Sequence, residues 1–230
     1  MAVQEIEVGK LVLESKLYPR LDVSPVHVAN LVDALRAGET FPPVVADDQR
    51  YILIDGAHRS KAWTQVYGEE AKIPCELVTA DDTGIFRLAV EYNTGHGLSL
   101  SPFERTKCLL RFAELGITRD VALLALRMSA DKAERVLEAK TAYRALPGGG
   151  KQQIAIKGSL RDFRGETLTK KQQEVNDKCG GMRMHYYFAQ VIDLVESGLC
   201  DRATGKTLDK LYQLRDALNE RLSKRKKKSA

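Results

Sequence analysis

The sequence predicts an α+β fold in which a small domain with a mixed sheet comes first and helical regions follow. In residues 1–100, short apolar runs with β-type alternation are interleaved with segments of helical periodicity. From residue 101 onward, apolar residues recur three and four positions apart, as on one face of a helix. Charge divides the chain at the same place: residues 1–100 carry 9 Lys and Arg against 15 Asp and Glu, net −6, and residues 101–230 carry 27 against 16, net +11.

Length and composition restrict the class of protein. The 230 residues suffice for one compact fold with a smaller partner, or for two small domains. With 43% hydrophobic and 29% charged residues, the chain can bury a core, which excludes disorder as its dominant state. No apolar stretch approaches the roughly 20 residues that span a bilayer, and the opening MAVQEIEVGK does not resemble a signal peptide. We therefore expect a cytoplasmic protein with no membrane partner.

The first hundred residues predict a mixed sheet with short helices. Apolar alternation and short apolar runs indicate strands at 5–11, 44–46, 51–54 and 73–78, and helical spacing indicates helices at 25–37 and 60–67. The helix at 25–37 has Ser24 as its expected N-cap, Pro25 at its first position and Gly38 after its end. Residues 47–50 supply the turn of an expected hairpin.

Residues 101–143 predict three consecutive helices. Ser101-Pro102-Phe103-Glu104 has the form of a capping box, with a hydroxyl cap and a Glu three residues later. A short helix at 119–126, a turn, and a helix from 130 to about 143 with Ser129 as its cap then follow. This spacing is typical of a helix-turn-helix, whose second helix is presented to DNA, but it is also found in helical hairpins that only pack. Spacing alone leaves both interpretations open.

The remainder predicts a helical C-terminal region. Pro147-Gly148-Gly149-Gly150 is expected to be a flexible joint, and helical pieces are expected at 160–163, 170–175 and 186–197. Leucines three or four residues apart over 208–222 predict an amphipathic helix, for packing within its own domain or for dimer formation. The domain boundaries expected from these patterns are 1–100, 101–146, 151–222 and a basic tail at 223–230.

The cysteines and the basic tail have simple interpretations. The cysteines are widely spaced and lack a C-x-x-C pair, so we expect reduced structural thiols: Cys75, Cys108, Cys179 and Cys200. Six of the last ten residues are Lys or Arg and none is acidic. Such a run is either a solvated terminus or an attraction for phosphates that is independent of sequence.

The turn at residues 54–61 carries the densest polar chemistry. A Gly after a strand lets the backbone approach a ligand, and the free N–H groups of the following helix attract anions. Here Gly56 is followed by His58, Arg59 and Lys61, which add donors or positive charge, so phosphate is the ligand expected. The alternative is an ordinary strand-to-helix turn in which Asp55 caps the helix and pairs with Arg59.

Several motifs occur together in one order. They are Tyr18-Pro19-Arg20, a helical stretch at 28–38 followed by Pro43-Val44-Val45, Gly56-Ala57-His58-Arg59-Ser60-Lys61-Ala62, and the segment EYNTGHGLSLSPFE at 91–104. They resemble the Q-P-R element, the P-I-V-V strand, the G-E-R-R-x-R-A box and the E-N-x-x-R-x-x-L-x-P-x-E box of the ParB and sulfiredoxin superfamily. The order and spacing resemble ParB-like proteins, which join an N-terminal nucleotide-binding domain to a helix-turn-helix, over about residues 5–145.

The resemblance implies a site for CTP or another nucleoside triphosphate with Mg²⁺. It assigns the nucleotide and its phosphates to Arg20, Gly56, His58, Arg59, Ser60 and Lys61, and the metal to Glu91 and Asn93. Two positions depart from the family pattern. Ala57 stands where the box has the Glu associated with hydrolysis, and Tyr92 separates Glu91 from Asn93. The resemblance therefore does not carry over hydrolysis or a preference for CTP.

Two functions from different classes fit these residues. The first is a nucleotide-regulated DNA-binding protein, a nucleoid-associated homodimer acting in partition or transcriptional regulation, with Lys132, Arg135 and Lys140 on the DNA. The second is an enzyme of the same superfamily, a nucleoside triphosphatase, phosphotransferase or nuclease, with His58, Glu91 or His96 as base or metal ligand. We favour the first, because catalysis requires neither a helix-turn-helix nor a basic tail. Sulfiredoxin chemistry is excluded because Ala57 has no nucleophile.

Overall fold

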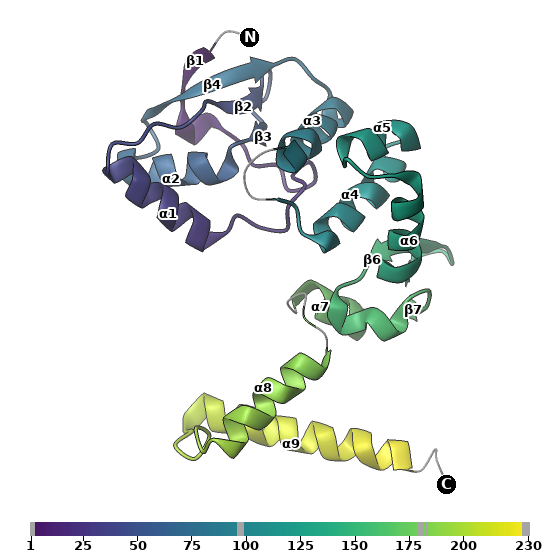
Figure 1. The fold of residues 1–230 in the computed structure, drawn as a ribbon. Helices are drawn as coiled ribbons and strands as arrows, with labels where there is room; N and C mark the ends of the chain where they lie inside the picture. The colour runs from purple at the N-terminus through teal and green to yellow at the C-terminus, as the bar shows by residue number, and fades with distance from the viewer. Residues whose placement is uncertain (1–2, 96–98, 179–181, 183, 227–230) are drawn as a thin grey trace. The chain divides into compact units, whose positions relative to one another are not determined.

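The computed structural model describes residues 3–95, 99–178, 182 and 184–226. The chain divides into two units, residues 1–181 and residues 182–230. The first unit contains two small sheets and most of the helices, and the second is helical (Figure 1). The predicted α+β class, with a helical C-terminal region, is confirmed.

The first sheet lies between two groups of helices. Its order is β1 (Val3–Glu7), β4 (Lys72–Val78), β2 (Val44–Asp47) and β3 (Leu53–Asp55), with β2 parallel to β4 and the other pairs antiparallel. On one side lie α1 (Pro25–Arg36) and α2 (Ala57–Tyr67), and on the other lies α3 (Asp82–Gly95). Alternate strand residues enter different cores: Val44 and Ala46 pack with α1 and α2, whereas Val45 and Ile54 pack with α3.

Local chemistry explains where the helices of this domain begin. The Ser24 hydroxyl accepts the backbone N–H of His27, so the expected N-cap of α1 is confirmed. The second helix begins at Ala57, three residues earlier than predicted, because Gly56 adopts φ +93° and turns the chain directly from β3 into α2. The helix α3, which carries Glu91 and Asn93, was not predicted from the sequence.

The predicted helix-turn-helix geometry is present in the same unit. α4 (Pro102–Glu114) begins with the expected capping box and is followed by α5 (Arg119–Ala125) and α6 (Ala130–Lys140). The hydrophobic core that contains Val45 of the sheet also contains Phe112 of α4, Leu126 at the end of α5, and Ala133 of α6. The three helices therefore share one core with the first domain.

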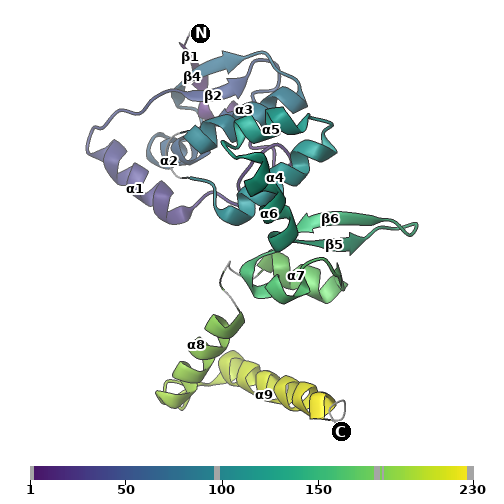
Figure 2. The same cartoon turned by 45° about the vertical axis from the view of Figure 1, so that its right-hand side comes forward.

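A second sheet replaces the expected end of α6 and the expected flexible joint. β5 (Thr141–Ala145), β6 (Lys151–Ala155) and β7 (Thr167–Leu168) pair in the order β6-β5-β7. Residues 147–150 are the turn of the β5–β6 hairpin, in which Gly148 and Gly149 have φ of +96° and +94° and the Leu146 N–H donates to Gly150 O (Figure 2). The glycines thus act through positive φ, which a tight turn requires, and the interpretation as a flexible joint is wrong.

Short helices complete the first unit. The 3-10 helix η2 (Gly158–Phe163) and α7 (Lys170–Lys178) match the helical pieces predicted there.

Burial raises the pKa of Cys75 to about 11 and that of Cys108 to about 12, so both thiols stay protonated, as structural cysteines should. Cys179 lies outside the described residues.

The second unit consists of α8 (Met184–Glu196) and α9 (Gly205–Lys226), as the periodicity predicted. Many of its large apolar side chains are exposed, including Phe188, Ile192, Leu194, Val195 and Leu199. None of the helices in the described part of the chain combines the length and apolar character that a bilayer span requires. The last four residues of the basic tail, 227–230, lie outside the described residues.

The carboxylate of Glu104 makes two contacts from a buried position. Its Oε2 accepts the Ser101 N–H at 2.7 Å, closing the capping box, and its Oε1 accepts the Leu21 N–H at 3.0 Å. A hydrogen bond to a charged group contributes roughly 1.5–3 kcal/mol, and a buried donor left without a partner costs a similar amount. Glu104 therefore joins the loop before α1 to the start of α4.

We expect Glu104→Gln to lower the free energy of unfolding by about 1–3 kcal/mol, because the amide oxygen of Gln can replace only one carboxylate oxygen as an acceptor. Urea denaturation monitored by circular dichroism measures the change. Glu138→Gln, on the exposed surface of α6, is the matched control and should change stability little. Equal stability of the two variants would show that the Glu104 contacts do not hold the loop.

Candidate functional site

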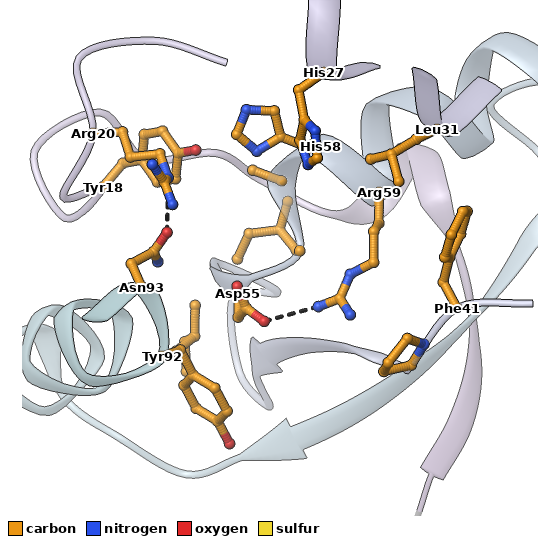
Figure 3. A pocket seen from close by; sticks show the side chains of 15 residues that line it. Tyr18, Arg20, His27, Leu31, Phe41, Asp55, His58, Arg59, Tyr92 and Asn93 are labelled. Atoms are coloured by element: carbon orange, nitrogen blue, oxygen red, sulfur yellow. Dashed lines mark hydrogen bonds and ion pairs between the residues drawn. The ribbon is translucent and has the colours of Figure 1, made fainter. Parts of the chain in front are cut away.

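A cavity of about 330 Å³ opens where β3 meets α2. Its wall comes from the loop before α1, the end of β3, the first turn of α2, and one face of α3 (Figure 3). The polar side chains that line it are Tyr18, Arg20, His27, Asp55, His58, Arg59, Tyr92 and Asn93. Apolar residues including Leu31, Phe41 and Leu53 complete the lining. The size and mixed lining fit a small-molecule site.

The first turn of α2 supplies donors for an anion. Gly56 is its N-cap and provides no side-chain cap, so within the described residues the N–H groups of the first turn are not capped by a side chain. Gly56 is also required sterically, since a Cβ there would lie 2.6 Å from Val44 Cγ1, in addition to the strain of φ +93°. Uncapped amides and the positive end of the helix dipole favour a negatively charged ligand at this point.

Two arginines lie on the wall of the cavity. Arg59 donates to Asp55 Oδ2 at 2.8 Å, so the ion pair expected in the alternative interpretation of this turn is present. Asp55 does not cap α2, however, because Gly56 holds the cap position. Arg20 is buried and its Nε donates to Asn93 Oδ1 at 2.8 Å, while Asn93 Nδ2 donates to Ala89 O (Figure 3). Both guanidinium groups are thereby oriented before any ligand binds.

His58 is an uncharged member of the site. Its Nε2 accepts the Ser24 N–H at 3.0 Å, and its ring meets that of His27 edge to face at 4.9 Å. Burial, the neighbouring His27 and Arg20 lower the pKa of His58 to about 4. At neutral pH the ring therefore carries its single proton on Nδ1 and binds an anion as a neutral donor only.

The structure brings together five of the residues expected at the nucleotide and the metal, and separates three. Those that line the cavity are Arg20, Gly56, His58, Arg59 and Asn93. Ser60 is buried one turn into α2, and Lys61 is exposed; neither lines the cavity. Glu91 pairs with Arg87 at 2.6 Å and is also absent from the lining. Residues two apart on a helix point in different directions, which separates Glu91 from Asn93.

Tyr18, His27 and Phe41 line the cavity but were not assigned to it from the sequence. Tyr18 directly precedes the Pro19-Arg20 motif, which is the one signal that pointed to it. His27 and Phe41 reach the site only through the packing of α1 and the segment after it, for which the sequence contains no local signal.

The described lining of the cavity contains no preformed metal site. Among the described residues that line it, Asp55 is the one carboxylate, and that carboxylate is paired with Arg59. Within the described residues, no group of three or more His, Cys, Asp and Glu side chains could hold a metal ion. The donors here suit phosphate oxygens, and Mg²⁺, which keeps several waters, fits this site only as an ion carried by those phosphates.

The residues expected on DNA lie on α6. Lys132 and Arg135 are exposed, and Lys140 is partly buried at the end of the helix. The acidic Glu134 pairs with Arg119 of α5 at 3.2 Å, so part of the negative charge on α6 is matched by its neighbour.

The low pKa of His58 predicts a pH dependence. The unfolded chain takes up a proton near pH 6.5, but the folded chain does so only near pH 4, so stability is lost as the pH falls from about 6.5 to about 4. The loss should be on the order of 3 kcal/mol and level off below that range. His58→Gln, whose amide oxygen can accept the Ser24 N–H without titrating, should flatten this part of the curve.

His185→Gln in α8 is the control, and urea midpoints measured across pH 4–7 compare the stability of the wild type and the two variants. Parallel curves for all three would contradict the assignment.

Comparison with known proteins supports the resemblance. Residues 1–94 match the family model of the ParB N-terminal domain. The transcriptional regulator NovG of Streptomyces niveus is 30% identical over 102 residues, which span 44% of this chain and 30% of NovG. The chain thus matches less than a third of that curated relative.

Solved structures of ParB proteins are also similar, at low identity. The Caulobacter crescentus partitioning protein ParB complexed to the parS site is 16% identical, with a TM-score of 0.43 over 63% of this chain and 73% of that one. The same protein complexed with CTP-γ-S is 14% identical, with a TM-score of 0.37 over 60% and 78%. A Pnob8-like ParB-N domain is 19% identical, with a TM-score of 0.39 over 67% and 57%.

The family match covers the sheet, α1, α2 and α3, and ends at residue 94, one residue beyond the cavity residue Asn93. The cavity thus lies within the matched segment, together with the motifs on which the resemblance rests. Residues 1–94 therefore match the ParB N-terminal domain, and the chain is ParB-like over this segment.

Proposed function

We propose that this protein binds DNA through α5 and α6 and that a nucleoside triphosphate in the cavity beside α2 regulates that binding. The observation that carries the proposal is the convergence of an uncapped helix N-terminus with Arg20 and Arg59 on one cavity in a ParB N-terminal domain. Backbone amides and guanidinium groups together are the donors that phosphate chains prefer.

The connection between the cavity and the helix-turn-helix supports regulation. Arg20 lines the cavity, and the next residue, Leu21, donates its N–H to Glu104 of α4. Cys108 of α4 contacts the Pro19 carbonyl at 3.6 Å. A ligand that draws on Arg20 therefore acts on a loop that is fastened to the first helix of the DNA-binding region.

The biological role proposed is transcriptional regulation, with partition as the other role of such a protein. The relative NovG is a transcriptional regulator, and its similarity to this chain is the observation that favours regulation. Binding as a homodimer, through the exposed apolar residues of α8 and α9, is part of the proposal. Sedimentation velocity of the full chain tests the dimer.

For the nucleotide, Arg59→Ala should weaken binding about tenfold or more, because it removes a charge-assisted contact worth roughly 1.5–3 kcal/mol. Isothermal titration calorimetry with CTP, ATP, GTP and UTP in the presence of Mg²⁺ measures the affinity. Lys61→Ala removes a positive charge just outside the cavity and should change the affinity far less. If the wild-type chain binds none of the four nucleotides, the assignment of the cavity is wrong.

For DNA, Lys132→Ala or Arg135→Ala should weaken binding to a selected site by roughly 1–3 kcal/mol while leaving binding to random DNA nearly unchanged. Both side chains lie in the first two turns of α6, where a recognition helix meets base edges. Selection from random duplexes followed by fluorescence anisotropy provides the measurement. Lys206→Ala in α9 is the control. Enrichment of the same sequence with equal strength by wild type and Arg135→Ala would show that α6 only packs.

A further inference from the structure

A second and larger cavity, of about 590 Å³, lies elsewhere in the first unit. It is lined by residues of α3, α4, β5, β6, α7 and the segment before Arg20, and shares Tyr18 with the first cavity. Its apolar lining includes Pro19, Phe86, Phe103, Leu110, Ile154 and Ala155, and Tyr18 and Cys108 also line it. The aromatic rings and the branched aliphatic side chains offer a flat or extended apolar body a surface to contact.

The charged side chains of this cavity leave an excess of positive charge. The lining contains four cations and two carboxylates, which gives a net charge of +2: Lys16, Lys107, Arg111 and Arg144, with Glu114 and Asp177. Arg111 donates to Glu114 at 2.9 Å, and Glu114 also accepts from Gln152 at 2.6 Å. The negative charge of Glu114 is therefore already engaged with its neighbours.

Arg111 and Arg144 of the lining each donate a hydrogen bond to a neighbouring side chain, and among the described residues the ammonium groups of Lys16 and Lys107 do not. In the part of the chain that the structure describes, neither ammonium has an ion pair or hydrogen bond. Both residues are exposed at the edge of the cavity. They are two positive charges available to a ligand whose apolar body lies deeper.

The wall of this cavity is held in place by buried polar contacts. Asn176 of α7 is buried, its Oδ1 accepts the Lys157 N–H at 2.9 Å, and its Nδ2 donates to Ala155 O at 3.0 Å. The Lys157 ammonium lies 5.4 Å from the centre of the Phe103 ring. These contacts fasten α7 to β6, so the space between them is a formed cavity.

We propose that this cavity binds a small organic acid with an aromatic or aliphatic body and a single carboxylate. The body contacts Phe103, Leu110 and Ile154, and the carboxylate pairs with Lys107 and Lys16. A polyphosphate suits the site less well, because the N-terminus of α4 is closed by its own capping box and offers no free backbone cradle.

The test uses 2-naphthoate as the probe, titrated into the full chain and followed by calorimetry and by amide chemical shifts in ¹H–¹⁵N spectra. We expect binding that shifts amides of residues 107–111 and 152–155. The neutral 2-naphthamide has the same body without the charge and should bind about tenfold more weakly. Lys107→Glu should weaken 2-naphthoate binding about tenfold or more, whereas Lys206→Glu, on α9, should not.

Ile154→Trp provides a second variant, which fills the apolar part of the cavity and should abolish binding of both probes. Lys107 is an exposed residue, so its variant retains the fold and keeps the test decisive if Ile154→Trp does not fold. Three results would overturn the proposal: no binding of 2-naphthoate at millimolar concentration, equal affinity for 2-naphthamide, or shifts confined to α8 and α9, whose exposed apolar residues can bind aromatic molecules nonspecifically.

Discussion

The arrangement of the first unit depends on the buried carboxylate of Glu104. One oxygen holds the start of α4 and the other holds the loop that contains Arg20, so two segments more than eighty positions apart share one side chain. A capping box normally serves only its own helix. Here the same residue also ties the loop that lines the cavity beside α2 to α4, the first of the three helices α4, α5 and α6.

The elements that local chemistry defines were predictable. Ser24, Ser101 and Ser129 cap α1, α4 and α6 as their residue types and spacing indicated. Caps, helix-terminal glycines and apolar periodicity act over three or four residues, so a single sequence contains all the information needed to recognise them.

The elements that depend on distant partners were missed. β5, β6 and β7 are short and gain their stability from pairing with one another, and α6 yields to β5 at Thr141, a β-branched residue that pairs with Ala155. The glycines at 148–150 were noticed, but a turn and a flexible joint have the same composition. Only the pairing of strands on either side distinguishes the two.

In the candidate site, too, the features set by neighbouring residues were predictable and those set by distant packing were not. Gly56, His58 and Arg59 lie in one turn, and their common location could be predicted from adjacency. Glu91 was expected at the site with Asn93 because of the resemblance to the family's third box, but α3 points the two side chains to different sides. His27 and Phe41 reach the cavity through packing alone. The uncharged state of His58 is likewise a consequence of burial and of its neighbours, which no local pattern encodes.

Tyr18 lines both cavities, and burial raises its pKa to about 12, so an uncharged side chain is shared by the two linings. A change in the position of this side chain would alter the shape of both cavities. For the two ligands proposed, any coupling is reciprocal: by whatever factor an acid in one cavity changed the affinity for a nucleotide in the other, the nucleotide would change the affinity for the acid by the same factor. Tyr18 is thus the shared wall residue through which the two proposed ligands would act on each other.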